Sequence, residues 1–180
     1  YLLEKNRVVT QGKDERNFHI FYQLISSSDT LGSPEQFNYL NQSGCTDIEG
    51  VDDLDDFQCT DTAFRNLGFS PLVVAAVYRL LEAILFLGNV NFVSDGDGAR
   101  VEPGSTSEHD LELVCGILEI ERSELVSLLT HRKLVIRGTT TLRQLNPEAA
   151  VAERDSICKN LYETIFTYIV QEANKNLHMT

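Results

Sequence analysis

The sequence lacks the residue patterns that mark most enzyme active sites. Its 180 residues contain no G-x-x-x-x-G-K-S/T phosphate loop, no H-E-x-x-H and no G-x-S-x-G. Those patterns are the usual signatures of nucleotide, zinc-protease and serine-hydrolase sites. The run Gly96-Asp-Gly98 is too short and too acidic to hold a phosphate group. We therefore expect no catalytic residue and no cofactor-binding residue in this chain.

Cysteine and histidine are few and scattered. The chain has four cysteines without a C-x-x-C pair, and four histidines without metal-ligand spacing. We expect free thiols in a reducing cytosol and no metal site. The acidic run at residues 47–56 does not follow the order of an EF-hand calcium loop. A calcium or basic-partner interpretation of that run would rest on charge alone.

Long apolar runs and an excess of positive charge are also missing. No apolar stretch approaches the ~20 residues of a membrane-spanning helix, so we expect no membrane insertion. The net charge of −12 argues against nucleic acid or an anionic membrane as a partner. The chain starts at Tyr1 without a basic and apolar leader, and we expect both ends to lie inside a longer protein.

One segment departs from the acidic average. Between residues 126 and 147 there is no acid, but there are four bases: Arg132, Lys133, Arg137 and Arg143. This pattern is either a chance run on a solvated face or a surface for an acidic partner, and the residues alone leave both open.

The periodicity predicts a mainly α fold with a small β contribution. Residues 1–10 are expected to form a strand, and residues 93–106 a surface loop rich in glycine. Ser70-Pro71 is a helix start, and the apolar helix after it is predicted to be buried and to close at Gly88. A short helix is expected from Thr60 to a C-terminal glycine, Gly68. Further elements are predicted as a helix carrying the apolar residues from Phe18 to Ile25, a ribbon around Gly138, and a long helix over 146–177.

Several ordered blocks resemble the myosin motor head. YLLEKNRVV (residues 1–9) with ERNFHIFYQL (15–24) is similar to the YLLEKSRVV…ERNFHIFYQL segment of that family, and AILFLGNVNF (83–92) to its AILHLGNIxF. FNYLNQSGC with IEGVDD (37–53), the LGFS ending of residues 62–70, and RDSICKNLY with FTYIV (154–170) extend the resemblance over nearly the whole chain.

The resemblance implies a piece of an actin-based motor. The chain would be most of the upper 50-kDa subdomain of a P-loop-type α/β motor head: a transducer strand at 1–10, helices over 17–130, an actin-contacting loop at 131–143 and a long helix at 146–177. The phosphate loop and both nucleotide switches would lie outside it. The parent head would bind ATP and Mg²⁺, hydrolyse ATP, and couple phosphate release to force on actin filaments in the cytoplasm. The alternative is a myosin-like head that only tethers actin without hydrolysis.

The same resemblance implies a set of actin-binding residues: Arg132, Lys133, Arg137, Thr139 and Arg143. Thr139 stands where the family has an acidic or phosphorylatable residue, which implies a heavy-chain kinase as a possible partner besides actin and the rest of the head. Residues 93–106 occupy the place of a second, weaker actin contact, but three acids against one base there argue against it. Glu4, Lys5 and Arg16 are expected to form internal ion pairs.

Overall fold

The computed structural model describes residues 3–136 and 139–178. The described chain is mostly helical, with two small antiparallel sheets. The helices are η1 (Lys5–Val8), α1 (His19–Ser26), η2 (Pro34–Gln36), α2 (Asp53–Asn66), α3 (Pro71–Asn89), α4 (Thr106–Leu118), α5 (Arg122–Thr130) and α6 (Pro147–His178). The strands are β1 (Val93–Asp95), β2 (Gly98–Arg100), β3 (His131–Ile136) and β4 (Thr139–Gln144).

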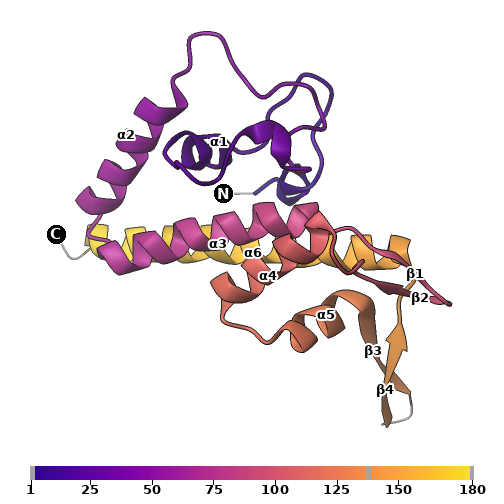
Figure 1. Cartoon of the computed structure of the whole chain (residues 1–180). Helices are drawn as coiled ribbons and strands as arrows, with labels where there is room; N and C mark the ends of the chain where they lie inside the picture. The colour runs from indigo at the N-terminus through magenta and orange to yellow at the C-terminus, as the bar shows by residue number, and fades with distance from the viewer. Residues whose placement is uncertain (1–2, 137–138, 179–180) are drawn as a thin grey trace.

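Two long helices, α3 and α6, lie side by side and form the middle of the molecule (Figure 1). Helices α1 and α2 with η1 lie on one side of this pair, and α4 and α5 lie on the other. The hairpin of β3 and β4 projects away from the body beyond α5 (Figure 1). The core between the layers is built from large side chains, including Phe21, Tyr22, Tyr39, Ile84 and Leu85, all at most 1% exposed.

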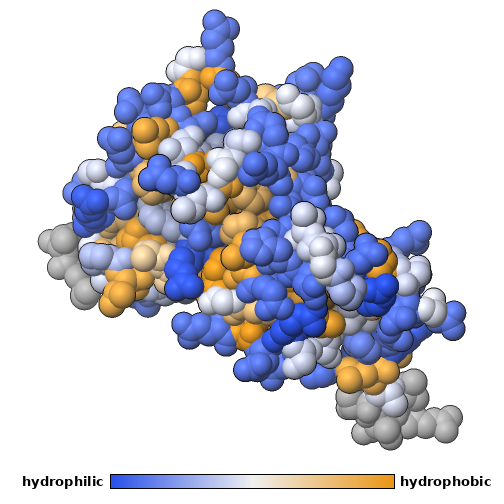
Figure 2. All heavy atoms as spheres, viewed as in Figure 1, coloured by the Kyte–Doolittle hydropathy of each residue, from blue (hydrophilic) through white to orange (hydrophobic). Residues whose placement is uncertain are grey.

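Helix α3 starts where the sequence predicts. The Ser70 hydroxyl accepts a hydrogen bond from the Val73 amide, and Pro71 follows at the first position of the helix. With 19 residues and a mean hydropathy of 1.8, α3 is by itself long and apolar enough to cross a membrane, so the expectation that no stretch reaches this length is wrong. Helix α3 packs against α4 and α6. The predicted burial is confirmed for most of residues 81–88, whereas Leu72 near the start is 84% exposed. In Figure 2 apolar groups gather across the middle of the viewed face, between hydrophilic margins.

Gly88 does not end α3, contrary to the prediction. The helix continues to Asn89, and the ring of Tyr39 lies against the Gly88 Cα, so that a Cβ there would be 2.5 Å from the Tyr39 Cδ2. The glycine is needed for this close approach and not for its backbone freedom. At Gly68 the prediction is confirmed: it follows α2 with a φ of +80°.

Helix α2 begins eight residues earlier than predicted, because its N-cap is Asp52 and not Thr60. The Asp52 carboxylate caps it by accepting hydrogen bonds from the Leu54 and Asp55 amides. Thr60 is instead inside the helix and donates a hydrogen bond to Gln23. The acidic residues of the first turn, Asp53, Asp55 and Asp56, face the positive end of the helix dipole. Part of the acidic run therefore has a structural role as a helix start.

Residues 3–10 contain the 3₁₀ helix η1 where the sequence predicts a strand. A strand needs a neighbour to take its hydrogen bonds, and the described residues pair only β1 with β2 and β3 with β4. The amides of Val9 and Thr10 bond back to the Asn6 carbonyl instead. Val8 is fully buried, and η1 packs against α6.

The predicted loop at residues 93–106 is also more ordered than expected. Residues 93–100 form the short hairpin β1–β2, in which Val93 pairs with Arg100, and α4 begins at Thr106. Ala99 and Val101 are buried, which explains why the segment folds back on the body.

The predicted ribbon is confirmed as two paired strands, although Gly138 itself lies outside the described residues, and the long last helix is confirmed as well. Strands β3 and β4 pair in antiparallel register from His131 with Gln144 to Ile136 with Thr139. Helix α6 runs for 32 residues, roughly 48 Å, and its start is capped by the Asn146 side chain, which accepts from the Ala149 amide. The predicted ion pairs are present as Glu4 with Arg7, Lys5 with Glu163, and Arg16 with Asp53.

Candidate functional site

The hairpin of residues 131–144, called the basic hairpin below, brings most of the predicted contact residues together. In its register Arg132 lies directly opposite Arg143, and Lys133 lies opposite Leu142. Successive residues of a strand point to opposite faces, so the two arginines share one face and Lys133 occupies the other. All three cationic side chains are exposed. The hairpin thus carries positive charge on both faces.

The structure does not describe every predicted residue of the hairpin. Arg137 lies outside the described residues. Thr139 is the first residue of β4, and its backbone pairs with Ile136, the last residue of β3. The described residues of the predicted site therefore lie on one antiparallel pair of strands.

The base of the basic hairpin is fixed to the core. The Leu145 amide donates to the Thr130 carbonyl over 2.8 Å, which closes the hairpin just before α6. Thr130 is 1% exposed, and its hydroxyl donates to the Val126 carbonyl at 2.7 Å. Leu145 and Ala150 are buried beside it. An isolated two-stranded ribbon is only marginally stable in water, so this buried base supplies support that the strands lack.

One of the predicted contact residues already has a partner in the chain. The Arg132 Nη2 lies 2.7 Å from the Glu153 Oε2 in α6. In the described part of the chain, Lys133 and Arg143 have no such acidic partner. The three cations are therefore not equivalent.

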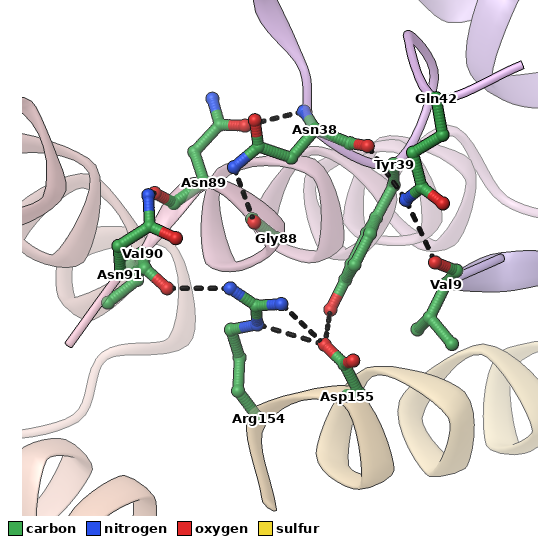
Figure 3. Close-up of polar contacts among 10 residues, drawn as sticks. All are labelled: Val9, Asn38, Tyr39, Gln42, Gly88, Asn89, Val90, Asn91, Arg154 and Asp155. Atoms are coloured by element: carbon green, nitrogen blue, oxygen red, sulfur yellow. Dashed lines mark hydrogen bonds and ion pairs between the residues drawn. The ribbon is translucent and has the colours of Figure 1, made fainter. Parts of the chain in front are cut away.

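Next to this ion pair, α6 carries a buried polar cluster that holds three elements together (Figure 3). Arg154 donates to the Val90 carbonyl at the end of α3 over 2.7 Å, and to the Asp155 Oδ1 from both Nε and Nη2. The Tyr39 hydroxyl donates to the same carboxylate oxygen at 2.6 Å. We call Glu153, Arg154 and Asp155 the α6 junction.

Burial controls the protonation of this cluster. Burial lowers the pKa of the Arg154 guanidinium, but its interactions, including the charge and hydrogen bond of Asp155, raise that pKa overall. Burial raises the pKa of the Tyr39 hydroxyl well above its ordinary value, and that of the nearby Cys158 thiol to about 12. Burial therefore disfavours the charged forms of the Tyr39 hydroxyl and the Cys158 thiol, beside the ion pair of Arg154 with Asp155.

The segment that carries Tyr39 forms hydrogen bonds both to the end of α3 and to the residue that follows η1. Asn38 donates through its amide to the Asn89 side chain at 2.8 Å, and through its own side chain to the Gly88 carbonyl. Gln42 donates to the Val9 carbonyl just after η1 (Figure 3). The α6 junction is thus connected through Tyr39 to the N-terminal segment.

The described residues hold no group of three or more His, Cys, Asp or Glu side chains that could bind a metal ion. The four cysteines are free thiols, two of them buried. The described residues present cations on a projecting ribbon. They also fix the position of that ribbon with respect to α3, α6 and η1.

The comparison with known proteins decides the family. The family described as "Myosin head (motor domain)" matches residues 1–180. The chain belongs to the myosin head family. It is 39% identical to unconventional myosin-Vb of Mus musculus over 99% of this chain, and 38% identical to unconventional myosin-Va of Gallus gallus over 100% of it. It is 36% identical to Myosin-1 of Sclerotinia sclerotiorum over 98% of the chain.

This myosin head segment is a small part of such proteins. It spans 10% of the length of the two unconventional myosins and 15% of that of the fungal relative. The resemblance seen in the sequence motifs is confirmed at the level of the family. The subdomain and the individual contact residues remain predictions.

Sequence reasoning missed the α6 junction. Arg154 and Asp155 belong to the block RDSICKNLY, and Tyr39 belongs to FNYLNQSGC. Both blocks indicated the family, but neither indicated that these side chains meet. Two adjacent opposite charges inside a helix that is otherwise apolar on that face are a signal of a buried pair, since burial of charge requires a partner. The partners Tyr39 and Val90 have no such signal because they are far away in the sequence.

Proposed function

We propose that this chain is the part of an actin-based motor head that presents the basic hairpin to the filament. The observation that carries the proposal is the projecting ribbon with exposed Lys133 and Arg143, in a segment free of acids, on a chain with a net charge of −12. An actin filament surface is acidic, and complementary charge speeds encounter and selects the partner. Arg132, Arg137 and Thr139 belong to the same proposed contact.

We place the chain in the upper 50-kDa subdomain of the complete head. Residues 1–10 would adjoin the central transducer sheet, whose other strands belong to the rest of the head. ATP and Mg²⁺ would bind outside this chain, which has no phosphate-loop pattern. There they would supply the hydrolysis that the head couples to force on actin. The proposed location of the whole protein is the cytoplasm, in association with the cytoskeleton.

Cosedimentation of the intact parent head with actin filaments tests the proposal. We expect binding that MgATP releases. Binding that MgATP leaves unchanged would favour a tether without hydrolysis, and the absence of binding would contradict the proposed function.

Neutralising the exposed cations should weaken this binding. Lys133→Gln and Arg143→Gln are each expected to reduce the affinity of the nucleotide-free head for actin about threefold, as for one exposed charge pair, and the loss should shrink with added salt. Lys13→Gln is a matched control, because it removes an exposed lysine remote from the hairpin in sequence. A loss as large in the control would contradict a specific role of the hairpin.

Thr139 is the proposed site of a heavy-chain kinase. A phosphate there would add about −1.5 to −2 charges beside the cations of the hairpin and change its approach to actin. After kinase treatment of the parent head we expect a phosphopeptide map with phosphate on Thr139, and its loss in Thr139→Ala. Phosphate on none of Thr139, Thr140 and Thr141 would contradict the assignment.

A further inference from the structure

Arg132 differs from the other cations of the basic hairpin in how it is held. Its guanidinium lies 2.7 Å from the Glu153 carboxylate, whose side chain is only 27% exposed. A carboxylate partly withdrawn from water interacts more strongly with its partner than one at a fully exposed site. The contact joins the stem of a projecting ribbon to the helix that runs through the body. Among the described residues it is the one ion pair between these two elements.

The cross-strand register gives the ion pair a second role. Arg132 and Arg143 are directly opposed in the ladder, and like charges in that position repel each other. Glu153 neutralises Arg132 and leaves Arg143 with its charge uncompensated. The ion pair therefore reduces the repulsion between the two arginines. It also offsets the charge of Arg132, so that a partner would meet the uncompensated charge of Arg143 alone on this face.

Glu153 also lies next to two residues of α6 that are bonded to other elements. The next two residues, Arg154 and Asp155, are bonded to the Val90 carbonyl and to the Tyr39 hydroxyl. Three consecutive residues of one helical turn thus bind three different elements: β3, the end of α3 and the segment that carries Tyr39. The stem of the hairpin is therefore attached to a turn of α6 that also binds two other elements of the body.

We infer that Arg132 is a positioning residue. Through Glu153 it sets the orientation of the basic hairpin on α6, and Lys133 and Arg143 are the cations of the described stem that meet the acidic partner. This inference rests on the proposed function for its partner, but the geometry of the pair does not depend on that partner. Under this inference Arg132 does not contact actin but positions the hairpin that does.

A contact role and a positioning role for Arg132 predict opposite changes in actin affinity for one substitution. Glu153→Gln frees Arg132 and adds one positive charge to the hairpin. If Arg132 contacts actin, this variant binds more tightly. If Arg132 is a positioning residue, Glu153→Gln and Arg132→Gln each weaken the actin affinity of the nucleotide-free parent head by about threefold, and the double variant is no weaker than either one.

Reversal of the pair tests the role directly. The double variant Arg132→Glu with Glu153→Arg restores the ion pair with the charges exchanged, and we expect it to recover the affinity of the unmodified head. Glu148→Gln is the matched control, since Glu148 is an exposed acid in the first turn of the same helix. It removes the same charge and should leave binding unchanged. Tighter binding by Glu153→Gln, or an exchanged pair that stays as weak as Arg132→Gln, would overturn the inference.

A measurement without actin separates this inference from the proposed function. Hydrogen exchange of the amides at 131–134 and 141–144 in the parent head should be faster in Arg132→Gln and Glu153→Gln, and unchanged in Lys133→Gln and Glu148→Gln. If the head fails to bind actin but shows this pattern, the proposed function fails and the positioning pair stands. Unchanged exchange in the two pair variants overturns the positioning role.

Discussion

Gly88→Ala is expected to destabilise the packing of α3 against the segment that carries Tyr39 by about 3 kcal/mol. The new Cβ would lie 2.5 to 2.9 Å from three atoms of the Tyr39 ring, well inside contact distance. The ring is 1% exposed, and its hydroxyl is held by Asp155 at 2.6 Å. It cannot move aside without leaving the Asp155 carboxylate, so the variant must accept either overpacking or a broken buried hydrogen bond.

Hydrogen exchange of the α3 amides in the parent head measures this effect. Gly116→Ala in α4 is the control: a Cβ at Gly116 meets nothing within 4 Å, and alanine favours a helix over glycine by about 0.5–1 kcal/mol. The two glycine-to-alanine changes should therefore have opposite signs. Equal, small effects at both positions would show that Tyr39 does not pack on Gly88 as described.

Arg154→Met is expected to cost about 3 kcal/mol of local stability, at the low end for a broken buried ion pair. Methionine fills much of the arginine volume but leaves the Val90 carbonyl without its donor and Asp155 without its cation. The Arg154 side chain is 8% exposed, whereas Asp155 is 26% exposed and is partly compensated by water. The loss should therefore appear at the end of α3 and in the segment around Tyr39 together, because Arg154 and Asp155 link both to α6.

Arg122→Met provides the comparison. Arg122 pairs with Glu108 and Glu112, but its side chain is 46% exposed, and exposed pairs contribute about 0.2–1 kcal/mol. Hydrogen exchange or limited proteolysis of the parent head should show a clear loss for Arg154→Met and little for Arg122→Met. A loss confined to α6 would contradict the view that the α6 junction holds three elements.

Local signals explain most of what could be predicted. The start of α3 needs only Ser70, Pro71 and an amide three residues later, and the end of α2 needs only a glycine that accepts a positive φ. The β3–β4 ribbon follows from its β-branched residues, and the start of α6 follows from the Asn146 cap. These interactions lie within a few residues, so the sequence contains both partners of each.

The errors have a common physical cause as well. Thr60 has the chemistry of a cap, but Asp52 competes with it and brings three more acids into the first turn. Gly88 has the chemistry of a helix end, but a ring from another segment occupies the space beside it. Residues 3–10 have β-branched side chains, but the chain has no strand beside them among its described residues. In each case the residue type is compatible with two structural roles, and the residues that surround it in the folded chain determine which role it has.

The sequence by itself determined the family, the mainly helical character, and the acid-free stretch that carries the proposed contact. Only the tertiary structure decided which cation of that stretch is paired inside the chain, namely Arg132, and which described cations are left for a partner, namely Lys133 and Arg143. Arg132 is 21 residues from Glu153, Arg154 is 64 from Val90, and Tyr39 is 116 from Asp155. A charge pattern along the chain shows which groups are present, but the partner of each depends on which helices pack together, and that is set by burial of apolar surface across the whole core.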